Sequence, residues 1–175
     1  VRSFDGLYGI PYGCYCSKTI RNMMMVGRII GASKLAMGST RVMGTCAVGG
    51  QAVGTAAALA AKYSCTPRVV GEQYMQELRQ QLLKDDCYII GCKNEDSKDM
   101  ARFAKVSASS YKKDAEPEHV INGVSRDEKD HVNCWCSDGL AAEGETLTLK
   151  LDKKHTLEEI RLTFDPNLSE EHCIS

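Results

Sequence analysis

The sequence predicts a mixed α/β segment followed by an antiparallel β segment, and three observations support this division. Hydrophobic residues make up 43% of the 175 residues, which is enough for a core. The hydrophobic period is helical before the polar stretch near residue 93 and alternates every two residues after it. Residues 1–92 carry ten Lys/Arg and five Asp/Glu, whereas residues 93–175 carry twelve and eighteen. We therefore predict one domain over 1–92, a linker over 93–97 and a second domain over 98–175.

The first segment opens with a turn-rich stretch, residues 1–21, which we expect to be a loop or a short edge strand. Residues 23–30 then form an apolar run without polar alternation, bounded by turn-forming residues. Such a run is typical of a strand buried on both faces. A buried helical segment is the alternative, but Gly27 and Gly31 argue against it.

A helix is predicted over residues 49–62, after a stretch of small residues that would let the backbone approach a ligand closely. Gly50, Gly54 and Ala58 recur every four residues, which leaves one helix face nearly bare. Unpaired N–H groups and the positive end of the helix dipole would favour negative charge near the helix start at Gly49. Tight packing against another element is the alternative interpretation of the same spacing.

A second helix is predicted over about residues 71–84, because Tyr74, Leu78 and Leu82 fall on one stripe. In the second segment, apolar and polar residues alternate over 104–109, 147–151 and 160–164, which indicates half-buried strands. We expect a small antiparallel β-sandwich there, with Trp135 in its core.

No carboxylate occurs between Gly6 and Gly71, although seven Lys/Arg residues do. Such a stretch suits an anionic ligand such as a pyrophosphate, and a buried segment without acids is the alternative.

The nine cysteines follow no zinc or disulfide spacing, so we interpret them as reduced and mostly buried thiols and predict no metal site. A metal site would require Cys14 and Cys16 to meet Cys134 and Cys136. No apolar run is long enough to span a bilayer, and no signal peptide is visible. We expect a cytoplasmic protein with neither a membrane nor a nucleic-acid partner. The chain starts with Val1 rather than Met, so we expect sequence upstream of it.

Several motifs of the first segment occur together and in a fixed order. They are Ile10-Pro11-Tyr12 and residues 22–28, 33–46, 50–59 and 82–85. Together they resemble the C-terminal part of the FAD-dependent oxidoreductases of the glutathione-reductase-like superfamily, over about residues 7–91.

The resemblance implies FAD as the cofactor, with Gly27 and Arg28 beside it at the end of a strand of the FAD-binding domain. It also implies a helix N-terminus that caps the isoalloxazine ring through Gly49, Gly50, Gln51, Ala52, Gly54 and Thr55. Arg41 and Lys34 would be the catalytic residues on the substrate side, where a cation orients an anionic substrate or stabilises developing charge. A structural salt bridge is the alternative role for Arg41.

This chain departs from the family pattern in ways that limit the prediction. Gly13 replaces an arginine that is common after Ile-Pro-Tyr, and Lys34 replaces a histidine, which leaves the acid/base residue unassigned. The dinucleotide fingerprint G-x-G-x-x-G, which would hold the ADP part of FAD, is absent. We therefore expect a fragment that is inactive alone, completed by a missing N-terminal FAD-binding part. Its residues 1–92 should expose an apolar or glycine-lined face.

The second segment has a looser resemblance of its own. It lies in residues 104–110, 120–126, 133–137 and 160–165, and it is similar to the galactose-binding-like jelly roll of discoidin and coagulation-factor type C modules, over about residues 98–170. The fold prediction is thus an incomplete FAD-binding α/β segment followed by an incomplete antiparallel β-sandwich. The resemblance implies a possible glycan ligand, with a purely structural appendage as the alternative.

Two functions follow as expectations. The first is a fragment of an FAD-dependent oxidoreductase that transfers hydride or electron pairs between a small organic substrate and flavin. The alternative is a non-catalytic module in which the β-sandwich binds carbohydrate and the first segment is a scaffold.

Overall fold

The computed structural model describes residues 7–128 and 131–164. The chain divides into two compact units, unit 1 (Val1–Asp96) and unit 2 (Ser97–Ser175).

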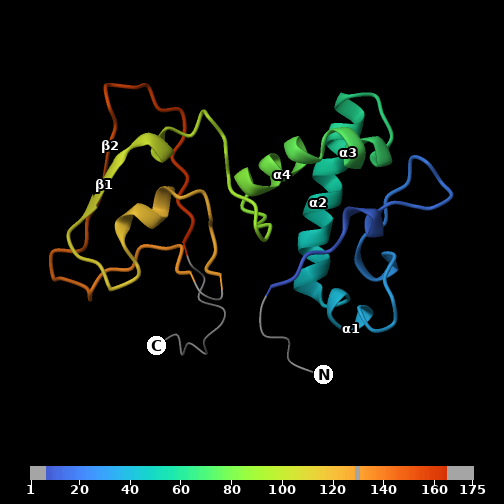
Figure 1. The fold of residues 1–175 in the computed structure, drawn as a ribbon, viewed down its shortest axis with the longest axis horizontal. Helices are drawn as coiled ribbons and strands as arrows, with labels where there is room; N and C mark the ends of the chain where they lie inside the picture. Colours follow the sequence, from blue (N-terminus) through green and yellow to red (C-terminus); the bar gives the residue numbers. More distant parts are fainter. Residues whose placement is uncertain (1–6, 129–130, 165–175) are drawn as a thin grey trace. The chain divides into compact units, whose positions relative to one another are not determined.

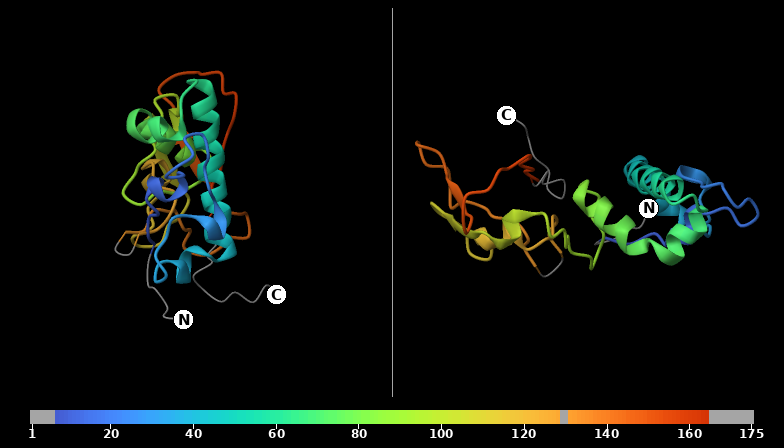
Figure 2. Two further views of the ribbon diagram at one scale, coloured as in Figure 1. Left: turned by 90° about the vertical axis from the view of Figure 1, so that its right-hand side faces the viewer. Right: turned by 90° about the horizontal axis from the view of Figure 1, so that it is seen from above.

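Unit 1 is built from helices (Figure 1). Its elements are the 3-10 helices η1 (Tyr12–Tyr15) and η2 (Gly27–Ile29) and the α-helices α1 (Met37–Thr40), α2 (Met43–Lys62), α3 (Pro67–Gln73) and α4 (Met75–Lys84). The long helix α2 contacts η2, α1, α3 and α4. Figure 1 shows α1 beside the start of α2, and α3 beside its end. The left view in Figure 2, in which α2 is again upright, also shows α1 near the start of α2. The helix α2 is therefore the axis around which the unit is arranged.

The core of unit 1 lies along the C-terminal half of α2. Ala56, Leu59 and Ala60 are buried there with Val70 of α3 and Leu78 of α4. The alanines let the other helices approach α2 closely, and burial of the larger side chains contributes about 1.5–3 kcal/mol each. The buried residues that α2 contributes to this core cluster all lie in its C-terminal half.

The segment η1 packs onto the helices through two glycines. A Cβ placed on Gly71 would lie 2.7 Å from Cδ1 and Cε1 of Tyr12, and one on Gly49 would lie 3.1 Å from the hydroxyl oxygen of Tyr15. The Tyr12 hydroxyl donates a hydrogen bond of 2.7 Å to the Pro67 carbonyl. Each tyrosine ring thus occupies the space that a side chain would fill on a neighbouring helix.

The predicted strand over residues 23–30 is wrong. Met24 forms a single antiparallel bridge with Cys16, and residues 27–29 form η2. Gly27 has a φ of +77°, a left-handed conformation that turns the chain out of an extended path. A strand also needs a partner strand for its backbone hydrogen bonds. Among the described residues of unit 1, residues 23–30 have no strand pairing other than this single bridge.

The two predicted helices exist, but their boundaries differ from the prediction. The helix α2 begins at Met43 rather than Gly49, because Val42 is the extended N-cap and glycine inside a helix costs only about 1 kcal/mol. The predicted helix over 71–84 is two helices, since the backbone at Tyr74 leaves helical values. The Tyr74 ring stacks on Tyr63 with ring centroids 4.0 Å apart.

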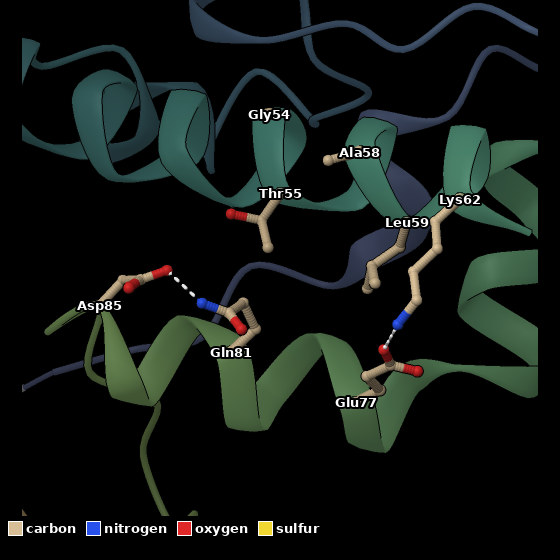
Figure 3. Close-up of a pocket in the computed structure, with 8 residues that line it drawn as sticks. All are labelled: Gly54, Thr55, Ala58, Leu59, Lys62, Glu77, Gln81 and Asp85. Atoms are coloured by element: carbon tan, nitrogen blue, oxygen red, sulfur yellow. Dashed lines mark hydrogen bonds and ion pairs between the residues drawn. The ribbon is translucent and has the colours of Figure 1, made fainter. Parts of the chain in front are cut away.

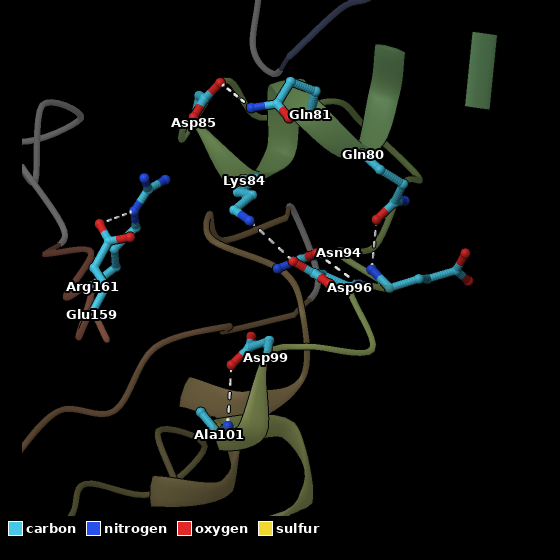
Figure 4. A network of polar contacts seen from close by, with 11 residues as sticks. Gln80, Gln81, Lys84, Asp85, Asn94, Asp96, Asp99, Ala101, Glu159 and Arg161 are labelled. Carbon is cyan, nitrogen blue, oxygen red and sulfur yellow. Dashed lines mark hydrogen bonds and ion pairs between the residues drawn. The ribbon is translucent and has the colours of Figure 1, made fainter. Parts of the chain in front are cut away.

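The stretch that follows α4 lies against that helix (Figure 4). The Gln80 side chain donates to the Lys93 carbonyl at 2.9 Å and accepts from the Glu95 N–H at 2.7 Å. Lys84 forms an ion pair with Asp96, with the nitrogen and oxygen 3.3 Å apart. Much of the predicted linker over 93–97 is thus held by polar contacts to α4.

Unit 2 contains η3 (Met100–Phe103), β1 (Lys105–Ala108), η4 (Pro117–Ile121) and β2 (Leu147–Lys150). The two strands pair antiparallel, with Lys105 opposite Lys150 and Ala108 opposite Leu147. Next to this strand pair, the Glu145 carboxylate accepts hydrogen bonds from the hydroxyls of Ser109 and Ser110.

The predicted β-sandwich is not seen in residues 97–128 and 131–164, which hold only this two-stranded sheet. Residues 160–164 form no strand, and Phe164 exposes 78% of its surface. Alternation alone does not fix a strand, because the backbone groups also need a partner strand. Trp135 is half-buried, and its ring N–H donates to the Ser110 carbonyl at 2.9 Å.

Within the ranges that the structure describes, no helix is both long enough and apolar enough to cross a membrane.

Candidate functional site

The start of α2 is an uncapped helix N-terminus. Val42 precedes it in an extended conformation, no side chain caps it, and its first turn contains no acidic residue. The N–H groups of Met43, Gly44 and Thr45 have no hydrogen-bond partner among the described residues. Helix N-termini ordinarily carry a capping side chain or an acid, because the helix dipole places about half a positive charge there. This end of α2 is therefore open and electropositive.

Gly27 lies next to this helix start. A Cβ placed on Gly27 would lie 4.0 Å from the Cys46 sulfur, and η2 contacts α2. The Cys46 thiol in turn contacts the Thr40 carbonyl at 3.6 Å, which joins α2 to α1. The left-handed backbone at Gly27 thus brings η2, with Arg28, beside the first turn of α2.

Three of the predicted site residues are exposed cations on these contacting elements. Arg28 is in η2, Arg41 is the C-cap of α1 and directly precedes the N-cap of α2, and Lys34 lies in the loop between η2 and α1. None of the three has an ion-pair partner in the part of the chain that the structure describes. The predicted structural salt bridge of Arg41 is thus not seen there.

The same region exposes large apolar side chains. Ile29, Leu35, Val42 and Met43 expose 70%, 92%, 52% and 89% of their surfaces. Exposed apolar side chains therefore lie around the start of α2, while Ala56, Leu59 and Ala60 of the same helix lie in the closed core.

The residues around Gly49 do not form a helix start. Residues 49–52 lie in the second and third turns of α2, where N–H groups bond to carbonyls of the preceding turn. Gly49 is buried against Tyr15, Ala52 packs against the core, and the Gln51 side chain donates to the Asp85 carbonyl at 2.9 Å. The predicted helix start at Gly49 is therefore wrong, whereas the contacts of Gly49, Gln51 and Ala52 with a flavin stay a prediction.

Gly50 and Gly54 behave as predicted for a bare helix face. A Cβ on either glycine would meet no atom within 4 Å. The Thr55 hydroxyl donates to the Gln51 carbonyl at 2.9 Å, which is a bond within its own helix.

An open groove of about 520 Å³ borders this bare face, between α2 and α4 (Figure 3). Its lining consists of Gly54, Thr55, Ala58, Leu59, Lys62, Glu77, Gln81 and Asp85. Lys62 and Glu77 form an ion pair of 2.7 Å across it, and the Tyr63 hydroxyl donates to Glu77 at 2.7 Å. The hydrogen bonds from Lys62 and then Tyr63 lower the pKa of Glu77. These contacts join α2 to α4 across the groove.

The cysteines are only partly buried, which differs from the prediction. All eight described cysteines are free thiols, of which Cys87 alone is buried, and Cys173 lies outside the described residues. Burial raises the pKa of Cys87 and of Cys16, which lowers the thiolate fraction and hence the reactivity of both. No group of three or more His, Cys, Asp or Glu side chains within residues 7–128 and 131–164 is arranged to hold a metal ion.

Comparison with known proteins adds one finding. A family model described as FAD dependent oxidoreductase matches residues 2–82. The match covers η1, η2, α1, α2, α3 and most of α4, which are the elements around the open helix start. Neither the curated proteins nor the solved structures contain a significant match. The galactose-binding-like resemblance of the second segment receives no support from these comparisons.

Sequence reasoning missed the helix start at Met43 and the roles of Tyr12 and Tyr15. The glycines at 44, 49 and 50 suggested a late start, because glycine has a low helix propensity. No local signal in the sequence pairs Tyr15 with Gly49, since they meet only when η1 folds against α2.

Proposed function

We propose that unit 1 forms one wall of the flavin site of an FAD-dependent oxidoreductase that transfers hydride or electron pairs between a small organic substrate and FAD. The observation that carries the proposal is the family match over residues 2–82, which covers the open helix start and the cations beside it. When bound, FAD supplies the redox chemistry, and the protein supplies binding, orientation and electrostatics.

The residues around the start of α2 fit one side of a flavin. The free N–H groups of residues 43–45 and the positive end of α2 would favour the flavin edge on which negative charge collects during reduction. The left-handed Gly27 leaves the backbone of η2 accessible beside this turn. Gly27, Arg28 and residues 43–45 are thus the proposed cofactor contacts, with the open glycines Gly50 and Gly54 further along α2.

The fit covers only part of the cofactor. No G-x-G-x-x-G fingerprint occurs in these 175 residues, so the groups that would hold the ADP part are not in this chain. We propose that a further FAD-binding segment of the same protein supplies them, and that the chain alone retains FAD weakly or not at all.

Arg41 is the proposed catalytic residue on the substrate side, with Lys34 as a second cation. Arg41 is exposed and unpaired in the described structure, and it directly precedes the N-cap of α2. A guanidinium there would orient an anionic substrate or stabilise charge that develops during transfer. No acid/base residue is proposed.

The first test is the visible absorbance spectrum of the protein purified with all the sequence that its gene encodes. We expect bound or titratable FAD. A folded preparation that neither contains FAD nor takes it up would contradict the proposal.

The second test compares Arg41→Gln with Arg79→Gln in that preparation. Arg79 is also an exposed arginine, and it lies on α4, outside the proposed site. Loss of one group that stabilises transition-state charge lowers turnover by about 100-fold, so we expect this loss for Arg41→Gln and none for Arg79→Gln. Unchanged flavin content in both variants would show that the loss is not a loss of cofactor, and equal turnover of the two variants would rule out the role of Arg41.

A further inference from the structure

The region around the start of α2 combines apolar and cationic side chains without a single acid. We define the cationic apolar patch as Arg28, Ile29, Lys34, Leu35, Arg41, Val42 and Met43. Its residues belong to, or lie next to, η2, α1 and the start of α2, and these three elements contact one another. The residues of the patch therefore lie in one region of unit 1.

The four apolar members are unusually exposed. Each of them exposes more than half of its surface, and Leu35 exposes 92%. A single exposed apolar residue is normal, but a group of them on contacting elements marks a binding surface.

The three cations define the charge of the ligand. Arg28, Lys34 and Arg41 have no ion-pair partner among the residues that the structure describes, and the sequence contains no carboxylate between Gly6 and Gly71. A ligand that is only apolar would leave three cations beside it without compensation, and a ligand that is only charged would leave the apolar side chains in water. A second copy of the same patch would bring like charges together. Charge complementarity therefore selects an anionic group joined to an apolar body.

We infer that the cationic apolar patch binds an amphipathic anion, a small molecule with one anionic group on an aliphatic or aromatic body. The inference rests on the proposed function, since it assigns this chemistry to the substrate of the same site. Arg41 and Lys34 hold the anionic group, and the apolar body lies over Leu35, Val42 and Met43. An anionic bilayer surface has similar chemistry, and the experiment distinguishes it from a free small molecule.

The test is a binding titration of the 175-residue chain with monomeric dodecanoate, followed by the backbone amide NMR signals. Two amphiphiles with the same tail, neutral dodecyl maltoside and cationic dodecyltrimethylammonium, are the charge controls. We expect saturable dodecanoate binding that shifts the signals of residues 28–43. Exposed charge pairs contribute up to about 1 kcal/mol each, so Lys34→Gln/Arg41→Gln should weaken binding by about tenfold. The matched control Arg79→Gln/Lys93→Gln, which alters two exposed cations outside the patch, should leave it unchanged.

Four results would overturn the inference. They are no saturable binding, equal affinity for the neutral or cationic amphiphile, equal weakening by the control variant, and binding to anionic phosphatidylserine vesicles without binding of monomeric dodecanoate. Flavin content measured on the gene-encoded protein separates this inference from the proposed function. A flavoprotein that does not bind dodecanoate contradicts the inference alone, whereas dodecanoate binding by a protein without flavin contradicts the proposed function alone.

Discussion

Replacing Gly71 by alanine tests how η1 is attached to the helices of unit 1. The new Cβ would lie 2.7 Å from two carbons of the Tyr12 ring, a separation that van der Waals repulsion forbids. The ring has little freedom to move, because its hydroxyl donates a 2.7 Å hydrogen bond to the Pro67 carbonyl in the same helix as Gly71.

The expected magnitude is the balance of three terms. Overpacking costs about 1–3 kcal/mol, and loss of the Tyr12 hydrogen bond adds about 1 kcal/mol if the ring is displaced. Alanine regains about 1 kcal/mol of helix propensity over glycine. We therefore expect the free energy of unfolding to fall by about 1–3 kcal/mol.

Gly54→Ala is the matched control, because Gly54 is also helical and a Cβ there would meet no atom within 4 Å. It should stabilise unit 1 by about 1 kcal/mol through helix propensity alone. The measurement is urea unfolding followed by the helical circular dichroism signal, since the only tryptophan, Trp135, reports on unit 2. If Gly71→Ala proved as stable as Gly54→Ala, the packing of Tyr12 against Gly71 would be refuted.

Three further outcomes follow from other contacts. Gln51→Leu removes the bond to the Asp85 carbonyl and should lower the unfolding free energy by about 0.5–1.5 kcal/mol, measured by urea unfolding; no change would mean that this bond is not formed in solution. The pKa of Glu77 is lower in the folded state than in the unfolded chain, so the ionised carboxylate contributes slightly to the stability of the fold. This stabilisation is present above the unfolded pKa of about 4.3 and is lost as the pH falls through the lower pKa of the folded state. Glu77→Gln should thus flatten the acid limb of stability against pH, and an unaltered limb would contradict the pairing with Lys62. Cys87, buried and with a raised pKa, should react last with a thiol reagent in the native protein, and labelling as fast as that of the half-buried cysteines would refute its burial.

The sequence allowed the helical parts of unit 1 to be predicted, because their signals are local. The alanine run of α2 and the stripe of Tyr74, Leu78 and Leu82 encode helices without reference to the rest of the chain. The strand over 23–30 failed because the same apolar run was compatible with strand pairing and with the bridge and 3-10 turn that Gly27 favours. Strands in unit 2 were predicted correctly where residues 105–108 and 147–150 pair with each other. Residues 160–164, which have the same alternation, have no partner strand among the described residues.

The sequence predicted the residue types of the candidate site better than it predicted the position of the helix start. The lack of acids and the exposed cations Arg41 and Lys34 could be read from the sequence, because they are properties of residue types. The exact helix start could not, because it depends on the extended backbone of Val42 and on the packing of Cys46 beside Gly27. A shift of six residues moves the positive end of the helix by about 9 Å, at a rise of about 1.5 Å per residue. That shift moves the helix start, on which the predicted anion site depends, from Gly49 to a point next to Arg41.

The position of Arg41 is itself an argument for a bound anion. Helices ordinarily place acids at their N-termini and cations at their C-termini, with each favourable charge worth about 0.3–1 kcal/mol. The helix α2 has the reverse arrangement at its start, where Arg41 precedes the N-cap, the first turn holds no acid and no side chain caps the helix. In the protein alone, this arrangement costs stability, and natural sequences retain such costs mainly where function requires them. A flavin edge or an anionic substrate at this point would turn the same repulsion into attraction. The uncompensated positive charge at the start of α2 therefore accounts both for the loss of stability in the protein alone and for the anion binding proposed for this unit.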